Sequence, residues 1–192
     1  MREATLSKAI LGSDSLLKKL AMVVFGSLAV GAAAQIEVPM FPVPMTLQTL
    51  VISVIGLTFG ARMAGLTLLA YLAEGAAGLP VFAGGSAGLA KLVGPTSGYL
   101  WGFVAMAFMT GWMVERGLSR GLVRLFIAAF VPATLLFVPG ALVLWAVVPT
   151  LDLNGALNAG VYPFLVGDVV KSFLAALVVV GGWQAVKSRK DA

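Results

Sequence analysis

Long apolar runs dominate this chain, and short groups of charged residues, prolines and glycines separate them. Residues 20–36, 92–114 and 125–151 carry no charge at all. A helix of about 17 to 25 apolar residues crosses a hydrocarbon core about 30 Å thick. The pattern therefore predicts six transmembrane helices, at about 20–36, 46–60, 63–79, 98–115, 124–148 and 161–186.

These runs predict an all-α integral membrane protein with one six-helix membrane domain over residues 20–186. The composition agrees, with 60% apolar and 11% charged residues and a mean hydropathy of +1.01. Residues 1–19 are expected to form a cytoplasmic or interfacial segment, and residues 187–192 a cytoplasmic tail. Within residues 4–20 we expect an amphipathic helix whose apolar face carries Leu6, Ile10, Leu17 and Leu20.

The placement of the positive charges predicts the orientation. In a membrane protein this placement matters more than the net charge of +5, so nucleic acid is not an expected partner. If both termini are cytoplasmic, the outer segments hold Lys91 alone, and Lys171 lies within the last helix. We expect a multi-pass protein of a prokaryotic cytoplasmic membrane whose inner segments carry Arg2, Lys8, Lys18, Lys19, Arg62, Arg116, Arg120, Arg124, Lys187, Arg189 and Lys190.

Several kinds of chemistry are excluded by residue types that the chain lacks. It has no Cys and no His, so it has no thiolate nucleophile, no imidazole base and none of the usual ligands for zinc, copper or haem. Neither 84–91 nor 167–172 matches the phosphate-binding pattern G-x-x-x-x-G-K-[ST]. We therefore expect no catalytic residue, metal or cofactor, and uphill transport would need a partner that supplies energy.

Two ionisable residues, Asp168 and Lys171, lie inside the last predicted helix. An ionisable group at membrane depth costs about 2.5 to 3.5 kcal/mol, so it usually faces a protein interior or a cavity. Their spacing of three places both on one helix face, where they either pair with each other or converge on a ligand. They lie about 10 and 15 Å from the outer end of the helix, within reach from outside.

The outer connections are unusual. Pro39, Pro42 and Pro44 predict an extended, stiff backbone at 37–45. Residues 80–98 are too apolar for a solvated linker and too rich in glycine and proline for a span, which favours a lid or binding loop over a loop packed on lipid headgroups.

Glu74, at the outer end of the third helix, has three interpretations: ligand contact, a pair with Lys91, or a side chain reaching water.

Small residues recur along the first helix at four-residue spacing, which lets another helix approach closely. The stripe either packs within this chain or docks a partner subunit. The candidate docking residues are Ser27, Gly31, Ala29 and Ala33.

Four motifs in order, at 38–50 (VPMFPVPMTLQTL), 78–85 (GLPVFAGG), 94–99 (GPTSGY) and 167–171 (GDVVK), resemble the BioY family, the biotin-specific S components of energy-coupling factor (ECF) transporters. The resemblance covers about 20–186. It implies a six-helix S-component fold and an outward-facing biotin pocket beneath the first and third loops. It also implies two partners, a transmembrane coupling protein and a pair of ABC-type ATPases.

The resemblance implies that Asp168 and Lys171 contact biotin. Lys91 stands where the family often has Arg, which keeps the charge but loses a two-pronged donor. Aromatic side chains are expected to enclose the two fused rings of biotin, and glycines to let the backbone approach the ligand closely. Neutral polar groups are expected to add hydrogen bonds to it. The further candidates are Phe82, Tyr99, Tyr162, Gly84, Gly85, Thr46, Gln48 and Glu74.

Three other functions stay open at this point. An S component for another vitamin would share the fold and differ in its loops. An intramembrane enzyme would use Glu74 and Asp168 as a carboxylate pair. A structural scaffold would leave the buried charges unexplained.

Overall fold

A computed structural model describes residues 5–7 and 15–191, with side chains through residue 188. Helices make up most of this part of the chain, and two strands of two residues each, β1 (Glu37–Val38) and β2 (Met45–Thr46), form a small antiparallel hairpin. The α-helices are α2 (Leu16–Ala34), α3 (Gln48–Phe59), α4 (Ala61–Ala76), α5 (Ser97–Met113), α6 (Leu122–Leu135), α7 (Phe137–Val147), α8 (Leu153–Gly160) and α9 (Leu165–Asp191).

The six predicted helices correspond to α2, α3, α4, α5, the pair α6–α7, and α9. Among the described residues, three stretches are long and apolar enough to cross a membrane: 16–34, 122–147 and 153–188. The α3 helix is apolar but shorter, with 12 residues. The chain is therefore a multi-pass, mostly helical membrane protein.

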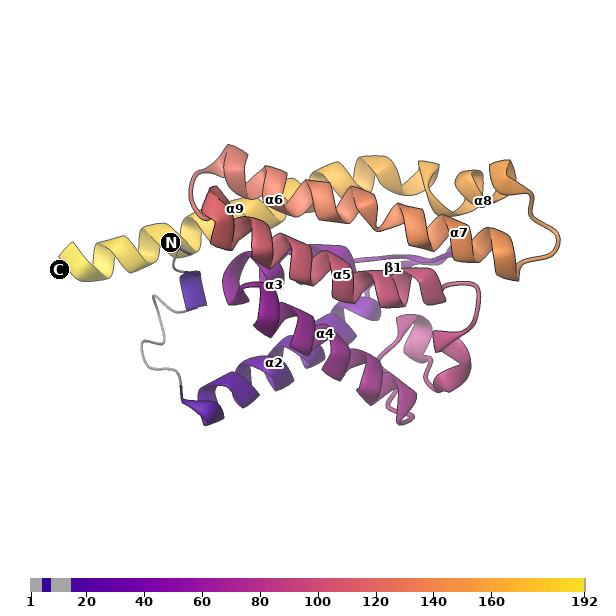
Figure 1. Cartoon of the computed structure of the whole chain (residues 1–192), viewed down its shortest axis with the longest axis horizontal. Helices are drawn as coiled ribbons and strands as arrows, with labels where there is room; N and C mark the ends of the chain where they lie inside the picture. Colours follow the sequence, from indigo (N-terminus) through magenta and orange to yellow (C-terminus); the bar gives the residue numbers. More distant parts are fainter. Residues whose placement is uncertain (1–4, 8–14, 192) are drawn as a thin grey trace.

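Figure 1 shows how the helices are arranged. The α3 and α5 helices lie in the middle, α2 and α4 pack along one side, and α6, α7 and α9 pack along the other. The start of α2 and the end of α9 lie at the same end of the molecule, and the β1–β2 hairpin lies toward the opposite end. The hairpin and the long loop between α4 and α5 therefore lie at the end of the molecule away from the C-terminus.

Several boundaries differ from the predicted ones. The first helix begins at Leu16, so Leu17 and Leu20 belong to α2 and are exposed, whereas Leu6 is buried and Ile10 lies outside the described residues. The sequence pattern missed α8, which precedes α9 and begins where Asp152 Oδ1 accepts a hydrogen bond from Gly155 N at 2.7 Å. The extended backbone predicted for 37–45 is present only at its ends, in the two strands at 37–38 and 45–46, and the chain bends at 41–43 between them.

The stripe of small residues on α2 is mostly internal. Ser27 and Ala33 are buried, and a side chain at Gly31 would meet Val81 at 3.3 Å. Their burial favours packing within the chain for these three residues, and docking of a partner subunit on this stripe stays a prediction. Of the four candidates, Ala29 is exposed.

Candidate ligand-binding site

A cavity of about 140 Å³ lies beneath the hairpin and the loop at 77–96, which we call the glycine-rich loop. Its walls come from the hairpin, the glycine-rich loop, α3, α5, the junction between α6 and α7 with the start of α7, and the start of α9 with the turn before it. The lining residues are Val43, Pro44, Thr46, Gln48, Thr49, Phe82, Ala83, Ser86, Lys91, Thr96, Tyr99, Leu100, Phe103, Leu136, Phe137, Phe164, Asp168 and Lys171.

The glycine-rich loop is folded onto the protein rather than extended into solvent. The ring of Phe82 is buried and occupies the space where a side chain at Gly75 would lie. At the end of α2, Gln35 Nε2 donates to the carbonyl of Phe82 at 3.2 Å, and Gln35 Oε1 accepts from Gly85 N at 2.9 Å. These contacts hold the loop over the cavity, as the prediction of a lid requires.

The two ionisable residues of α9 line the cavity, and Asp168 is only 5% exposed. Thr134 Oγ1 donates to Asp168 Oδ2 at 2.9 Å, which leaves Oδ1 able to accept from a ligand. Lys171 Nζ donates to the backbone carbonyl of Thr46 at 2.6 Å and has two further protons to donate. Among the described residues, no ion pair within 4.0 Å joins Asp168 to Lys171, so each has its own neutral partner.

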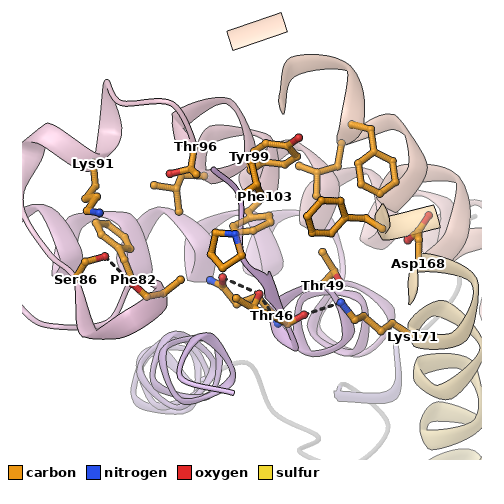
Figure 2. Close-up of a pocket in the computed structure, with 18 residues that line it drawn as sticks. Thr46, Thr49, Phe82, Ser86, Lys91, Thr96, Tyr99, Phe103, Asp168 and Lys171 are labelled. Carbon is orange, nitrogen blue, oxygen red and sulfur yellow. Dashed lines mark hydrogen bonds between the residues drawn. The ribbon is translucent and has the colours of Figure 1, made fainter. Parts of the chain in front are cut away.

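The cavity has two polar ends and an apolar middle. Figure 2 shows Lys91 and Ser86 at one end and Asp168 and Lys171 at the other. The rings of Tyr99 and Phe103 lie between them. Phe137 and Phe164 also line the cavity, with ring centroids 6.3 Å apart. Such a shape suits an elongated ligand with an apolar body and polar groups at both ends.

Seven of the predicted site residues line this cavity: Asp168, Lys171, Lys91, Thr46, Gln48, Phe82 and Tyr99. Tyr99 also donates its hydroxyl to the Gly160 carbonyl at 2.6 Å, which ties α5 to the end of α8.

Four predicted residues do not line the cavity. Tyr162 is 53% exposed. Gly84 and Gly85 adopt positive φ angles of 65° and 66°, and therefore shape the turn between Ala83 and Ser86, which do line the cavity. Glu74 Oε1 accepts a hydrogen bond from Ser27 Oγ at 2.6 Å, because this carboxylate faces α2.

In the described part of the chain, Glu74 neither lines the cavity nor forms an ion pair with Lys91, and its side chain is half-buried beside α2. Glu74 is also separate from Asp168, because Asp168 lines the cavity and Glu74 does not. The carboxylate pair of the enzyme hypothesis is therefore not assembled.

Sequence reasoning missed most of the apolar wall and the supporting residue Thr134. Phe103, Leu136, Phe137 and Phe164 look like ordinary lipid-facing or core residues in an apolar helix. Thr134 could be found only from its contact with Asp168, which is 34 positions away.

Known proteins resemble this chain in sequence and in fold. The sequence profile of the BioY family matches residues 3–188. The probable biotin transporter BioY of Pyrococcus horikoshii is 35% identical over 161 residues, which cover 84% of this chain and 93% of that protein. The biotin transporter BioY of Rhizobium etli is 35% identical over 156 residues, which cover 78% of this chain and 83% of that protein.

A solved structure shares the fold. The crystal structure of the S-component for biotin from an ECF-type ABC transporter superposes with a TM-score of 0.72 at 23% identity. The match covers 91% of this chain and 92% of that one. Profile, relatives and fold together show that this chain belongs to the BioY family.

Proposed function

We propose that this chain is the biotin-binding substrate-capture subunit of an ECF-type vitamin uptake transporter. The observation that carries the proposal is the cavity with an apolar middle and two polar ends. Biotin has a polar ureido ring, an apolar thioether bicycle and a carboxylate on a flexible chain. The ureido ring corresponds to the end of the cavity with Asp168 and Lys171, and the bicycle corresponds to the apolar middle. The carboxylate corresponds to the end with Lys91.

The ends of the cavity suggest how biotin lies in it. Asp168 accepts from the ureido N–H groups, and Lys171 donates to the ureido carbonyl. The aromatic rings enclose the bicycle, and Lys91 at the other end attracts the carboxylate. The second carboxylate oxygen of Asp168 stays with Thr134, which fixes the orientation of the acceptor.

Competition binding tests the ligand class. Labelled biotin bound to the purified protein should be displaced by unlabelled biotin and by desthiobiotin, which keeps the ureido ring and the carboxylate. Thiamine and riboflavin should not displace it, because neither offers this order of groups. Displacement by thiamine or riboflavin at the same concentrations as biotin would assign the cavity to another vitamin.

We infer that the cavity opens to the outside and that both termini are cytoplasmic. Arg62 in the first turn of α4, and Arg116 and Arg120 between α5 and α6, lie at the end opposite the cavity, as the positive-inside rule requires. Arg116 and Arg120 also lie over tryptophan rings, at 5.0 and 4.6 Å from the centroids of Trp112 and Trp183. Cations and tryptophans together are typical of a membrane interface.

Thiol labelling checks this orientation, because the chain has no cysteine of its own. Val93→Cys in the glycine-rich loop and Lys187→Cys near the C-terminus each introduce one exposed thiol. In spheroplasts, whose cytoplasmic membrane is intact, a membrane-impermeant maleimide should label Val93→Cys at once. It should label Lys187→Cys only after the membrane has been permeabilised. The reverse pattern would contradict the orientation.

Transport by this chain then needs partners. The sequence has no phosphate-binding loop, so the proposed partners are a transmembrane coupling protein and an ABC-type ATPase pair. The protein needs no cofactor for capture, and biotin is its transported ligand.

A further inference from the structure

A chain of hydrogen bonds links Lys171, which lines the cavity, to the glycine-rich loop. Lys171 Nζ donates to the Thr46 carbonyl at 2.6 Å, and Thr46 Oγ1 donates to Gln48 Oε1 at 3.0 Å. Gln48 Nε2 then donates to Tyr71 Oη at 2.8 Å, and Tyr71 Oη donates to the Val81 carbonyl at 3.1 Å. The path therefore runs from α9 through the hairpin, α3 and α4 to the loop that covers the cavity.

Tyr71 is the residue at which this chain reaches the loop. Its side chain is fully buried, and its hydroxyl both accepts and donates, so it meets the needs of two buried groups at once. Its ring packs edge-on against Phe82, with centroids 5.5 Å apart at 79°. Yet Tyr71 does not line the cavity, and any influence on a ligand must act through other residues.

The position of Val81 explains how the Tyr71 hydroxyl can affect the cavity wall. Val81 directly precedes Phe82, whose side chain lines the cavity. The carbonyls of Val81 and Phe82 are held by different helices, the first by Tyr71 of α4 and the second by Gln35 of α2. Loss of the Tyr71 hydroxyl would leave the Val81 carbonyl and the Gln48 amide without this partner, so the closed position of the loop would become less stable.

We propose that Tyr71 is a positioning residue whose hydroxyl keeps the glycine-rich loop closed over the bound ligand and thereby slows its release. This inference rests on the proposed function, because the ligand is taken to be biotin. The residue acts through Val81 and Gln48 rather than by touching the ligand.

Two variants separate this role from a general contribution to stability. Tyr71→Phe removes the hydroxyl and keeps the ring that packs on Phe82. Thr67→Val is the matched control, because Thr67 lies one turn earlier on α4, is fully buried, and donates its hydroxyl to the Met63 carbonyl at 2.8 Å, away from the cavity. Both variants lose one buried hydroxyl from the same helix.

The experiment measures biotin association and dissociation rates together with amide hydrogen exchange at residues 81–86. For Tyr71→Phe we expect about tenfold faster dissociation, a similar association rate and faster exchange in this segment relative to α5. Thr67→Val should match the wild type in its dissociation rate, its association rate and its amide exchange at residues 81–86. Combining Gln48→Leu with Tyr71→Phe should accelerate dissociation by less than the product of the single effects, because both act on one chain of bonds.

Wild-type dissociation and wild-type exchange in Tyr71→Phe would overturn the inference. If the wild type itself bound no biotin, the proposed function would fail. The exchange comparison would still decide whether the hydroxyl holds the loop.

Discussion

Asp168→Asn is expected to weaken biotin binding by about 10- to 100-fold. The change keeps the shape and the contact with Thr134, but it removes the charge and replaces one acceptor oxygen by a donor group. A hydrogen bond to a charged group contributes about 1.5 to 3 kcal/mol, and about 1.4 kcal/mol corresponds to a tenfold change in Kd. Equilibrium binding to the purified variant measures the effect.

Asp152→Asn is the matched control. Asp152 is exposed and caps α8 through its bond from Gly155 N, and Asn caps helices equally well. This variant should bind biotin like the wild type. Equal affinities of the Asp168 and Asp152 variants would show that Asp168 does not accept hydrogen bonds from the ligand.

Lys171→Met should weaken binding by about 100-fold, for two reasons. It removes a charged donor from the cavity, and it leaves the Thr46 carbonyl without the donor that is 2.6 Å away. An orphaned carbonyl would loosen the hairpin that forms one cavity wall, so the loss should exceed that of a ligand contact alone. The dissociation constant of biotin and the melting temperature of the variant, measured together, report both parts.

Lys187→Met provides the comparison for the loss of a positive charge. Lys187 is exposed near the C-terminus, far along α9 from the cavity, and its replacement should leave the Kd unchanged. The assigned role of Lys171 is wrong if Lys171→Met binds as tightly as Lys187→Met.

The helices could be predicted because a bilayer restricts them to long apolar segments with internal hydrogen bonds. Their boundaries shifted where a polar residue caps a helix, as Ser15 does at the start of α2 by accepting from Lys18 N at 3.3 Å. The α8 helix was missed because it has only eight residues, too few for a span. The Asp152 cap before it was the available signal.

The polar part of the site could be predicted because charge at membrane depth needs a reason, and Asp168 and Lys171 stand out against their apolar neighbours. The supporting contacts could not be predicted in the same way. Tyr71 meets Gln48, and Glu74 meets Ser27, only because separate helices pack together. Hydrophobic patterns give the face of a helix but not which side chains of two helices touch.

The proposed function can be tested by a titration of the purified, folded wild-type protein with biotin. A biotin-capture subunit should bind one biotin per chain in a saturable manner, and the ligand recovered afterwards should be chemically unchanged. Absence of saturable biotin binding by the folded protein would rule out the proposed function.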